Sequence, residues 1–203
     1  MKWEKIPNEK VFNETVEAVK FRGVDVIVVN NREEALEKIK KIIPNGVSIM
    51  SGSSETLKEI EFNEFLKSKD HGWKDIHEEI LNENDKEKQS DLRRRALIAE
   101  YFLGSVNAIA KTGELVACDA SGSRVGAYLF AAKKLILVAG FQKITGSLED
   151  AIKRVREYVY PLENERAKKV YGMPSTTGKW VIIEREIFPN RITLILVKEK
   201  LGY

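Results

Sequence analysis

Apolar residues recur at two different spacings near the start of the chain, and the spacings predict alternating helices and strands. Apolar positions three and four residues apart predict a helix that begins after Asn8 and ends near Gly23, and a second helix over 32–43. Mostly apolar runs over 24–29 and 47–50 predict strands on either side of the second helix. A strand, a helix and another strand in this order predict a parallel sheet.

The pattern beyond residue 60 predicts further helices and strands. The apolar run over 134–139 is typical of a strand buried on both faces of a parallel sheet. The segments 180–186 and 191–198 are predicted to pair with each other across a Phe-Pro-Asn turn. The other expected elements are short helices over 62–90, a longer helix over 84–103, strands over 107–110 and 115–118, and helices that begin at Ser147 and Pro161.

Length and composition favour a single domain. The chain has 203 residues, of which 43% are hydrophobic, and this is enough for one sizeable core. We find no tandem repeat and no low-complexity linker. The prediction is a three-layer α/β/α fold with a mostly parallel mixed sheet, in which an N-terminal helix (1–23) precedes a core (24–168) and a C-terminal strand pair (169–203).

Charge and hydropathy exclude several classes of partner. The 34 basic and 31 acidic residues leave a net charge of +3 with both signs interspersed, so we expect no nucleic-acid partner. The basic run 93–95 is typical of a solvated helix face. No apolar run approaches the ~20 residues that span a membrane, and the chain opens with charged residues, so we expect a cytoplasmic protein without a membrane partner.

Cysteine and histidine usage limits the cofactors. The single cysteine, Cys118, excludes an internal disulfide and any cysteine-held iron–sulfur cluster, and its place in a strand pattern favours a small buried side chain. The two histidines, His71 and His77, belong to no metal-binding motif. We therefore expect no metal site, and the identity of any cofactor stays unknown.

The segment 105–126 contains two short apolar runs and three glycine-centred turns, which predict a β-hairpin followed by a polar loop. The loop 119–124 gathers a carboxylate, two hydroxyls, a glycine and a guanidinium, which is more polar function than a connection needs. A small anionic ligand is the first hypothesis. Arg124 could hold a carboxylate or phosphate through two parallel hydrogen bonds, or it could pair structurally with Asp119.

A second polar loop, 51–56, leaves a predicted strand and enters a predicted helix. Its glycine and serines could let backbone N–H groups converge on an anion, or they could form an ordinary serine N-cap. The loop lacks the lysine and spacing of a P-loop, and the chain contains no G-x-G-x-x-G dinucleotide motif.

These loops supply the candidate site residues. If the chain is catalytic, Asp119 and Glu114 are the candidate carboxylates. They bracket a short strand, so they lie at its opposite ends, roughly 16 Å apart, or nearer each other if the strand has a bulge, and we do not expect them to act together on one atom. Asp119 is the candidate general base. The candidate ligand-binding residues are Gly52, Ser53, Ser54, Thr56, Asn107, Thr112, Gly113, Ser121, Gly122 and Arg124.

Three stretches of sequence resemble the LUD domain of the lactate utilisation proteins, and together they cover roughly 24–168. They are SVNAIAKTGELVACDASGSRVGAYLFAAKKLILVAGFQKI, LEDAIKRVREYVYPLENERAK and GSSETLKEI. The resemblance implies a fold like that of glucosamine-6-phosphate deaminase, ribose-5-phosphate isomerase and the CoA transferases. It also implies participation in the oxidation of L-lactate to pyruvate, alongside partners that hold iron–sulfur clusters.

The chain departs from its larger relatives, which append a cysteine-rich ferredoxin-like region. Three functions therefore stay open: an accessory component of lactate oxidation without its own iron–sulfur cluster, an independent enzyme acting on a small phosphorylated or CoA-linked substrate, and a regulatory domain that binds a small anion without catalysis. The expected partners are a small anionic metabolite and the iron–sulfur proteins of a lactate oxidation system, and self-association into a homo-oligomer is left open.

Overall fold

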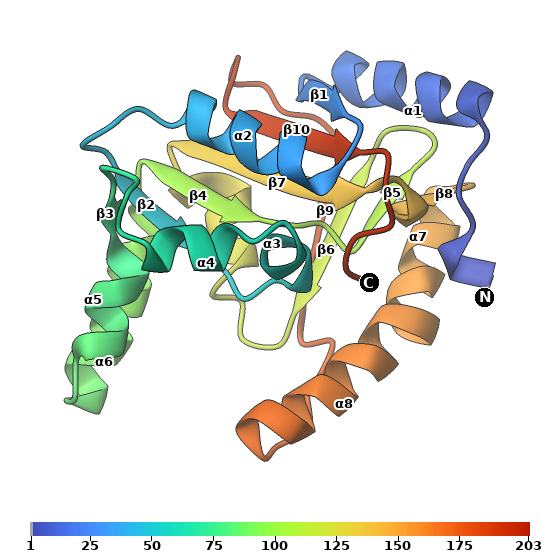
Figure 1. Ribbon diagram of the computed structural model, residues 1–203. Helices are drawn as coiled ribbons and strands as arrows, with labels where there is room; N and C mark the ends of the chain where they lie inside the picture. Colours follow the sequence, from blue (N-terminus) through green and yellow to red (C-terminus); the bar gives the residue numbers. More distant parts are fainter. Residues whose placement is uncertain (1) are drawn as a thin grey trace.

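A six-stranded sheet forms the centre of the molecule in the computed structural model, which describes residues 2–203 (Figure 1). The strand order is β1-β10-β7-β4-β2-β3, and every neighbouring pair is parallel. The strands are β1 (Asp25–Val29), β2 (Ser48–Ser51), β3 (Lys74–Asp75), β4 (Tyr101–Gly104), β7 (Lys134–Gly140) and β10 (Ile192–Val197).

The two faces of this sheet are buried against different partners. Leu135 and Leu137 of β7 pack in one cluster with α1 (Glu9–Phe21), whereas Ile136 and Val138 pack in another with α2 (Arg32–Ile42), α3 (Glu55–Glu59) and α4 (Phe62–Lys67). Alternate residues of a strand point to opposite faces, so an uninterrupted apolar run supplies both layers at once. The fold is a three-layer α/β/α arrangement, as the sequence predicts.

A smaller sheet packs on the α1 side and has the order β8-β5-β6-β9. Its strands are β5 (Ala108–Ala110), β6 (Leu115–Asp119), β8 (Ile144–Thr145) and β9 (Lys179–Ile183). The outer face of this sheet packs against α7 (Leu148–Arg154), which continues through a π-helical turn (Val155–Val159) into α8 (Tyr160–Tyr171). The remaining elements are α5 (Ile76–Asn82), α6 (Lys86–Arg95), a second π-helical turn (Ala127–Ala131) and 3₁₀ turns at Lys2–Glu4, Ala96–Ile98 and Phe141–Lys143.

Side-chain caps confirm two predicted helix starts. The Asn8 side chain accepts a hydrogen bond from the Val11 N–H at 2.9 Å, and the Ser147 hydroxyl accepts one from the Asp150 N–H at 3.1 Å. Each bond satisfies an N–H group that the first turn of a helix leaves unpaired. The β-α-β unit and the antiparallel β5–β6 hairpin also lie where the pattern places them.

The predicted helix over 84–103 is wrong in its last part. Helix α6 ends at Arg95, and residues 101–104 form β4 between β2 and β7. The apolar residues of that segment matched a helical spacing by chance. Phe102 and Leu103 are both buried, as expected for adjacent residues of a strand that is covered on both faces. This correction places residue 105 at the carboxyl end of a central strand.

The predicted C-terminal strand pair is also wrong. Strand β9 pairs with β6 in the small sheet, and β10 lies between β1 and β7 in the large sheet. The two strands are therefore in different sheets, and the fold core extends beyond residue 168. Sequence patterning identifies strands by their faces but carries little information on distant partners.

Candidate functional site

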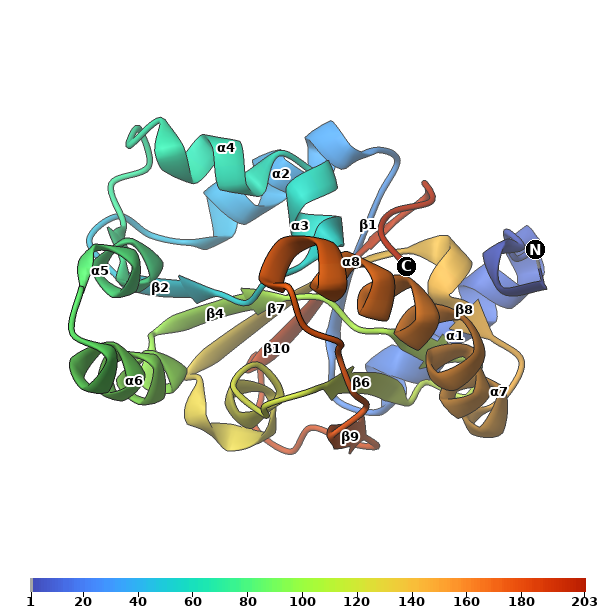
Figure 2. The ribbon, with the colours of Figure 1, turned by 90° about the horizontal axis from the view of Figure 1, so that it is seen from below.

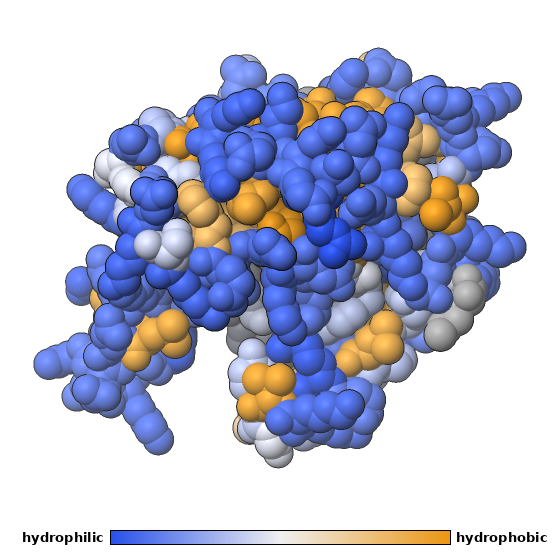
Figure 3. Space-filling model, in the orientation of Figure 1, coloured by the Kyte–Doolittle hydropathy of each residue, from blue (hydrophilic) through white to orange (hydrophobic). Residues whose placement is uncertain are grey.

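A pocket of about 740 Å³ opens at the carboxyl ends of β2 and β4. Side chains from α5, α6 and α8 line it. Figure 2 shows α5 and α6 on one side of the molecule, apart from α8. The space-filling view shows a hollow between these two projecting parts (Figure 3). The carboxyl ends of parallel strands are where open α/β sheets place their ligands.

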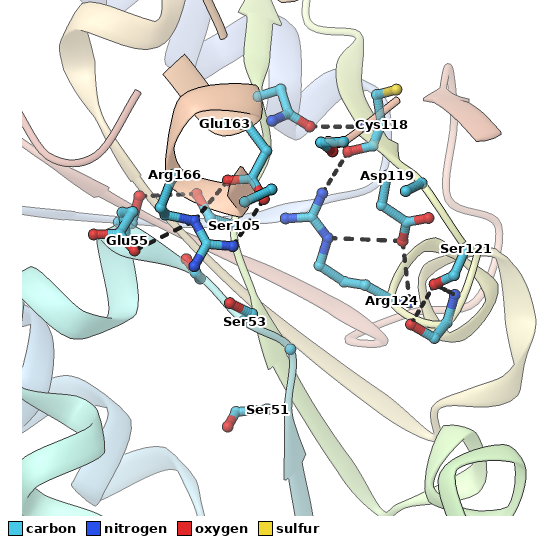
Figure 4. Close-up of a pocket in the computed structure, with 18 of the residues that line it drawn as sticks. Ser51, Ser53, Glu55, Ser105, Cys118, Asp119, Ser121, Arg124, Glu163 and Arg166 are labelled. Atoms are coloured by element: carbon cyan, nitrogen blue, oxygen red, sulfur yellow. Dashed lines mark hydrogen bonds and ion pairs between the residues drawn. The ribbon is translucent and has the colours of Figure 1, made fainter. Parts of the chain in front are cut away.

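Arg124 contributes a positive charge to one wall of the pocket. Its Nη2 donates to the Cys118 carbonyl at 2.6 Å, and its Nε lies 4.0 Å from an Asp119 carboxylate oxygen (Figure 4). Nε is buried and has no hydrogen-bond partner among the described residues. Among the described residues Nη1 makes no hydrogen bond either, and unlike Nε it is not buried, so Arg124 keeps a donor free at the pocket wall.

The Asp119 carboxylate organises the loop that carries Arg124. One oxygen accepts a short hydrogen bond from the Gly122 N–H, and the other accepts from the Arg124 and Val125 N–H groups, both at 3.1 Å. Three backbone donors thus occupy the carboxylate proposed as a general base. The geometry makes Asp119 a fixed element of the wall, and both oxygens of the proposed general base already accept backbone hydrogen bonds.

A second charged group lies on the opposite side of the pocket (Figure 4). Arg166 donates two hydrogen bonds of 2.8 Å to Glu163, and Glu55 lies 3.8 Å from its Nε. The paired carboxylate raises the pKa of Arg166 above its ordinary value. Unlike Arg124, this guanidinium is already matched by acidic groups.

Lys143 lies at the base of the pocket and is only 2% exposed. Its Nζ donates to Thr56 Oγ1 at 2.9 Å, Ser105 Oγ at 3.0 Å and the Val106 carbonyl at 3.1 Å. All three partners are uncharged. Burying a protonated lysine without a carboxylate partner costs free energy, because the charge loses its hydration and gains no ion pair.

The surroundings of Lys143 are electrically positive. Burial, followed by the charges of Arg154 and Arg124, holds the pKa of the Lys143 amine well below its ordinary value of 10.5. Burial also lowers the pKa of Arg154 to about 10. Arg154 is fully buried, and two of its nitrogens have no hydrogen-bond partner among residues 2–203. An anion near Arg154 and Arg124 would be stabilised by both of their charges.

Tyr128 fixes the backbone at the pocket base. Its hydroxyl accepts a hydrogen bond from the Ser105 N–H at 3.1 Å and donates one to the Ser105 carbonyl at 3.0 Å. A Cβ at Gly104 would lie 1.9 Å from the Tyr128 Oη, so only glycine leaves room for this side chain. The first residue after β4 is held at both its backbone groups.

The predicted ligand-binding residues divide into two groups. Gly52, Ser53, Ser54, Thr56, Asn107, Asp119, Ser121 and Arg124 line the pocket, and Gly122 lies within the same loop. Thr112, Gly113 and Glu114 lie outside it, at the far end of β6, where Glu114 forms an ion pair with Arg22 and a short hydrogen bond with the Thr112 hydroxyl. The geometry therefore gives Glu114 no part in this site.

The Gly52 loop is built differently from the predicted anion cradle. The Gly52 N–H donates to the Leu103 carbonyl at 3.1 Å, and Ser54 caps α3 by accepting from the Leu57 N–H at 3.2 Å. A Cβ at Gly52 would lie 2.9 Å from Arg124 Cγ. Glycine at this position makes room for the Arg124 side chain, which joins the two predicted loops.

Sequence reasoning missed Lys143, Tyr128 and Arg166. A charged residue three positions after the end of the buried strand β7 was a usable signal for Lys143, because lysine is rarely buried without a reason. By contrast, the interpretation of Cys118 as a small buried residue is confirmed. Burial, followed by the charge of Asp119, raises the pKa of its thiol to about 11 and keeps it protonated.

Within residues 2–203, no group of three or more His, Cys, Asp and Glu side chains is placed to hold a metal ion. No helix in that range is long and apolar enough to cross a bilayer.

The structure is that of an α/β protein with a pocket at the carboxyl edge of a parallel sheet. The family model of the LUD domain matches residues 12–197, so the chain belongs to the LUD domain family. It is similar in fold to the crystal structure of a DUF162 family protein from Deinococcus radiodurans, with a TM-score of 0.56 and 13% identity over 95% of this chain and 99% of that one. A comparison with curated proteins gave no significant match.

Proposed function

We propose that this chain binds a small anionic metabolite in the pocket and serves as an accessory component in the oxidation of L-lactate to pyruvate. Iron–sulfur clusters would be supplied by partner proteins, since this sequence has only one cysteine. Membership of the LUD domain family supports the link to lactate. Lactate and pyruvate are carboxylates, so the proposal requires a cation with a free donor in the pocket.

The state of Arg124 is the observation that carries this proposal. In the described part of the chain its Nη1 makes no hydrogen bond and is not buried, and the nearest carboxylate, that of Asp119, is occupied by three backbone N–H groups. Guanidinium groups bind carboxylates and phosphates through parallel charge-assisted hydrogen bonds. A bound anion would complete the coordination of Arg124 and offset the positive charge around Lys143.

A thermal-shift screen tests the proposal with L-lactate, pyruvate, sugar phosphates, nucleotides and CoA esters. A ligand at about 100 times its Kd adds about 2.7 kcal/mol to the free energy of unfolding, which corresponds to a rise in Tm of about 8 °C for a domain of this size. The proposal predicts this rise with L-lactate or pyruvate. The absence of a shift with both acids would reject the lactate role.

Replacement of Arg124 by lysine is expected to weaken anion binding at least about tenfold. Lysine keeps the charge but loses the paired donors, and the loss of one charge-assisted hydrogen bond corresponds to about 1.5–3 kcal/mol. Titration calorimetry with the best ligand measures the change. The matched control is Arg156→Lys, which changes a guanidinium stacked on Trp180 outside the pocket. Unchanged affinity together with a collapsed Tm would assign Arg124 a purely structural pairing with Asp119.

The size of the pocket favours a second candidate function, an independent enzyme with a larger substrate. Pockets of roughly 300–1,000 Å³ enclose drug-sized ligands, so a three-carbon acid would occupy only a small part of the 740 Å³. The outer walls contribute the apolar side chains Leu81, Leu97 and Val170. A shift in Tm with CoA esters or nucleotides, but not with lactate or pyruvate, would favour this candidate.

A further inference from the structure

Ser105 and Lys143 bring a hydroxyl and an amine into contact at the base of the pocket. The Ser105 Oγ lies 3.0 Å from the Lys143 Nζ, and the Thr56 Oγ1 lies 3.2 Å from the same Oγ and 2.9 Å from the same Nζ. All three residues line the pocket. A serine hydroxyl within hydrogen-bond reach of a general base is the arrangement of an activated nucleophile.

The contacts of Lys143 suit it to act as that base. Its partners are two hydroxyls and a carbonyl, and no carboxylate forms an ion pair with it in the described part of the chain. Charged groups face it from three elements: Arg154 of α7, Arg124 of the loop after β6 and Glu59 of α3. Burial and the two arginines favour the neutral amine. The neutral amine has two N–H groups, which suffice for Thr56 Oγ1 and the Val106 carbonyl, and its lone pair then faces the Ser105 hydroxyl and can accept its proton.

The position of Ser105 suits a nucleophile. It is the first residue after β4, at the carboxyl edge of the sheet, and Tyr128 holds both its N–H and its carbonyl. A reactive hydroxyl fixed in this way loses little freedom when it meets a substrate.

Asn107, two residues after Ser105, supplies a further donor to the same pocket. Its Oδ1 accepts from the Cys118 N–H at 2.7 Å, which fixes the side-chain amide. The Nδ2 has no acceptor among the described residues, and Asn107 lines the pocket. A free amide donor of this kind can stabilise the negative charge that develops on a carbonyl oxygen during attack.

We propose that Ser105 is the nucleophile and Lys143 the general base of an acyl-transfer reaction on an ester or thioester. The Ser105 Oγ forms a bond to the acyl carbon and passes its proton to the Lys143 Nζ. The bond from the acyl carbon to the leaving oxygen or sulfur then breaks, and Nζ returns the proton to the alcohol or thiol. Water hydrolyses the acyl-serine by the same route and restores the free hydroxyl.

The assignment rests on the pocket that is proposed above as the ligand site, but it does not depend on lactate. An anionic part of the acyl substrate would contact Arg124, while the carbonyl lies at Ser105. A neutral covalent probe needs no anion site, so its reaction separates the two proposals. Failure of the probe would leave anion binding intact, and failure of anion binding would leave the probe reactive.

A short-chain alkyl fluorophosphonate tests the assignment, because such probes form stable adducts with activated serines. Intact-protein mass spectrometry of the full chain should show one adduct, and peptide mapping should place it on Ser105. Ser105→Ala should abolish it. Lys143→Met should slow the labelling at least about 100-fold, the usual contribution of a general base. In the native protein the labelling rate should rise with pH and level off once the amine is neutral.

Ser90→Ala is the matched control, because Ser90 lies on α6 outside the pocket. The Ser90→Ala protein should be labelled at the same rate as the native protein. Circular dichroism checks that each variant is folded. Ser105→Ala removes only the hydroxyl and leaves the backbone contacts with Tyr128 in place, so it remains informative if Lys143→Met fails to fold. An unreactive native protein, an adduct on another residue or equal labelling of Ser105→Ala would overturn the assignment.

Discussion

Gly104→Ala is expected to lower the free energy of unfolding by about 3 kcal/mol, the upper part of the usual range for overpacking a core. The added Cβ would lie 1.9 Å from the Tyr128 Oη and 2.9 Å from its Cζ. Tyr128 is fully buried and cannot turn toward solvent. For a domain of this size the change corresponds to a fall in Tm of about 10 °C, which differential scanning calorimetry measures.

A double-mutant cycle with Tyr128→Phe identifies the cause. Phenylalanine removes the closest atom of the clash but leaves the Ser105 N–H and carbonyl unpaired. The unpaired groups alone should lower the free energy of unfolding by about 1–3 kcal/mol. Gly104→Ala should therefore destabilise the Tyr128→Phe background less than the native protein. Gly126→Ala is the control, because its Cβ would meet only Leu97 Cδ1 at 3.5 Å. Equal destabilisation in both backgrounds would show that Tyr128 is not the obstacle.

Local patterns were sufficient to predict most of the fold. The caps at Asn8 and Ser147 depend on side chains within three residues of the N–H groups they accept from, and the β5–β6 hairpin depends on a short turn. The run over 134–139 predicts burial on both faces without any knowledge of its neighbours. Each of these signals lies within a few residues of the feature it predicts.

Strand partners could not be predicted in this way. Strand β10 lies between β1 and β7, elements that are separated from it by more than fifty residues of sequence. An apolar strand fits several places in a sheet, and the choice is made by the packing of the whole core. The short segment 101–104 illustrates the same limit, because its three apolar side chains satisfy both helical and strand patterns.

In the candidate site, too, local sequence predicts some features, and others depend on contacts between distant segments. Both polar loops were found because glycine, serine and charged residues gather within each. Their contact, with Arg124 packed over Gly52, depends on a strand pairing that brings distant segments together. The cluster of Thr56, Ser105 and Lys143 combines residues up to 87 positions apart. No local pattern could identify this cluster.

Lys143→Met is expected to change how stability depends on pH. The folded protein holds the pKa of Lys143 well below 10.5, whereas the unfolded chain returns it to its ordinary value. Between the two pKa values the unfolded state binds more protons, so raising the pH stabilises the folded state relative to the unfolded one. The stability of the native protein minus that of Lys143→Met should therefore increase by about 1.4 kcal/mol per pH unit in this window.

Urea unfolding between about pH 6 and pH 10 measures this difference, since other titrating groups are common to both proteins and cancel. Below the folded pKa the difference should be constant, because Lys143 is protonated in both states. Lys133→Met is the control, because the Lys133 side chain is 73% exposed and its stability difference should stay flat with pH. A flat difference for Lys143→Met as well would mean that the amine keeps its proton in the folded protein. Lys143 would then be a structural cation, without the free lone pair that a general base requires.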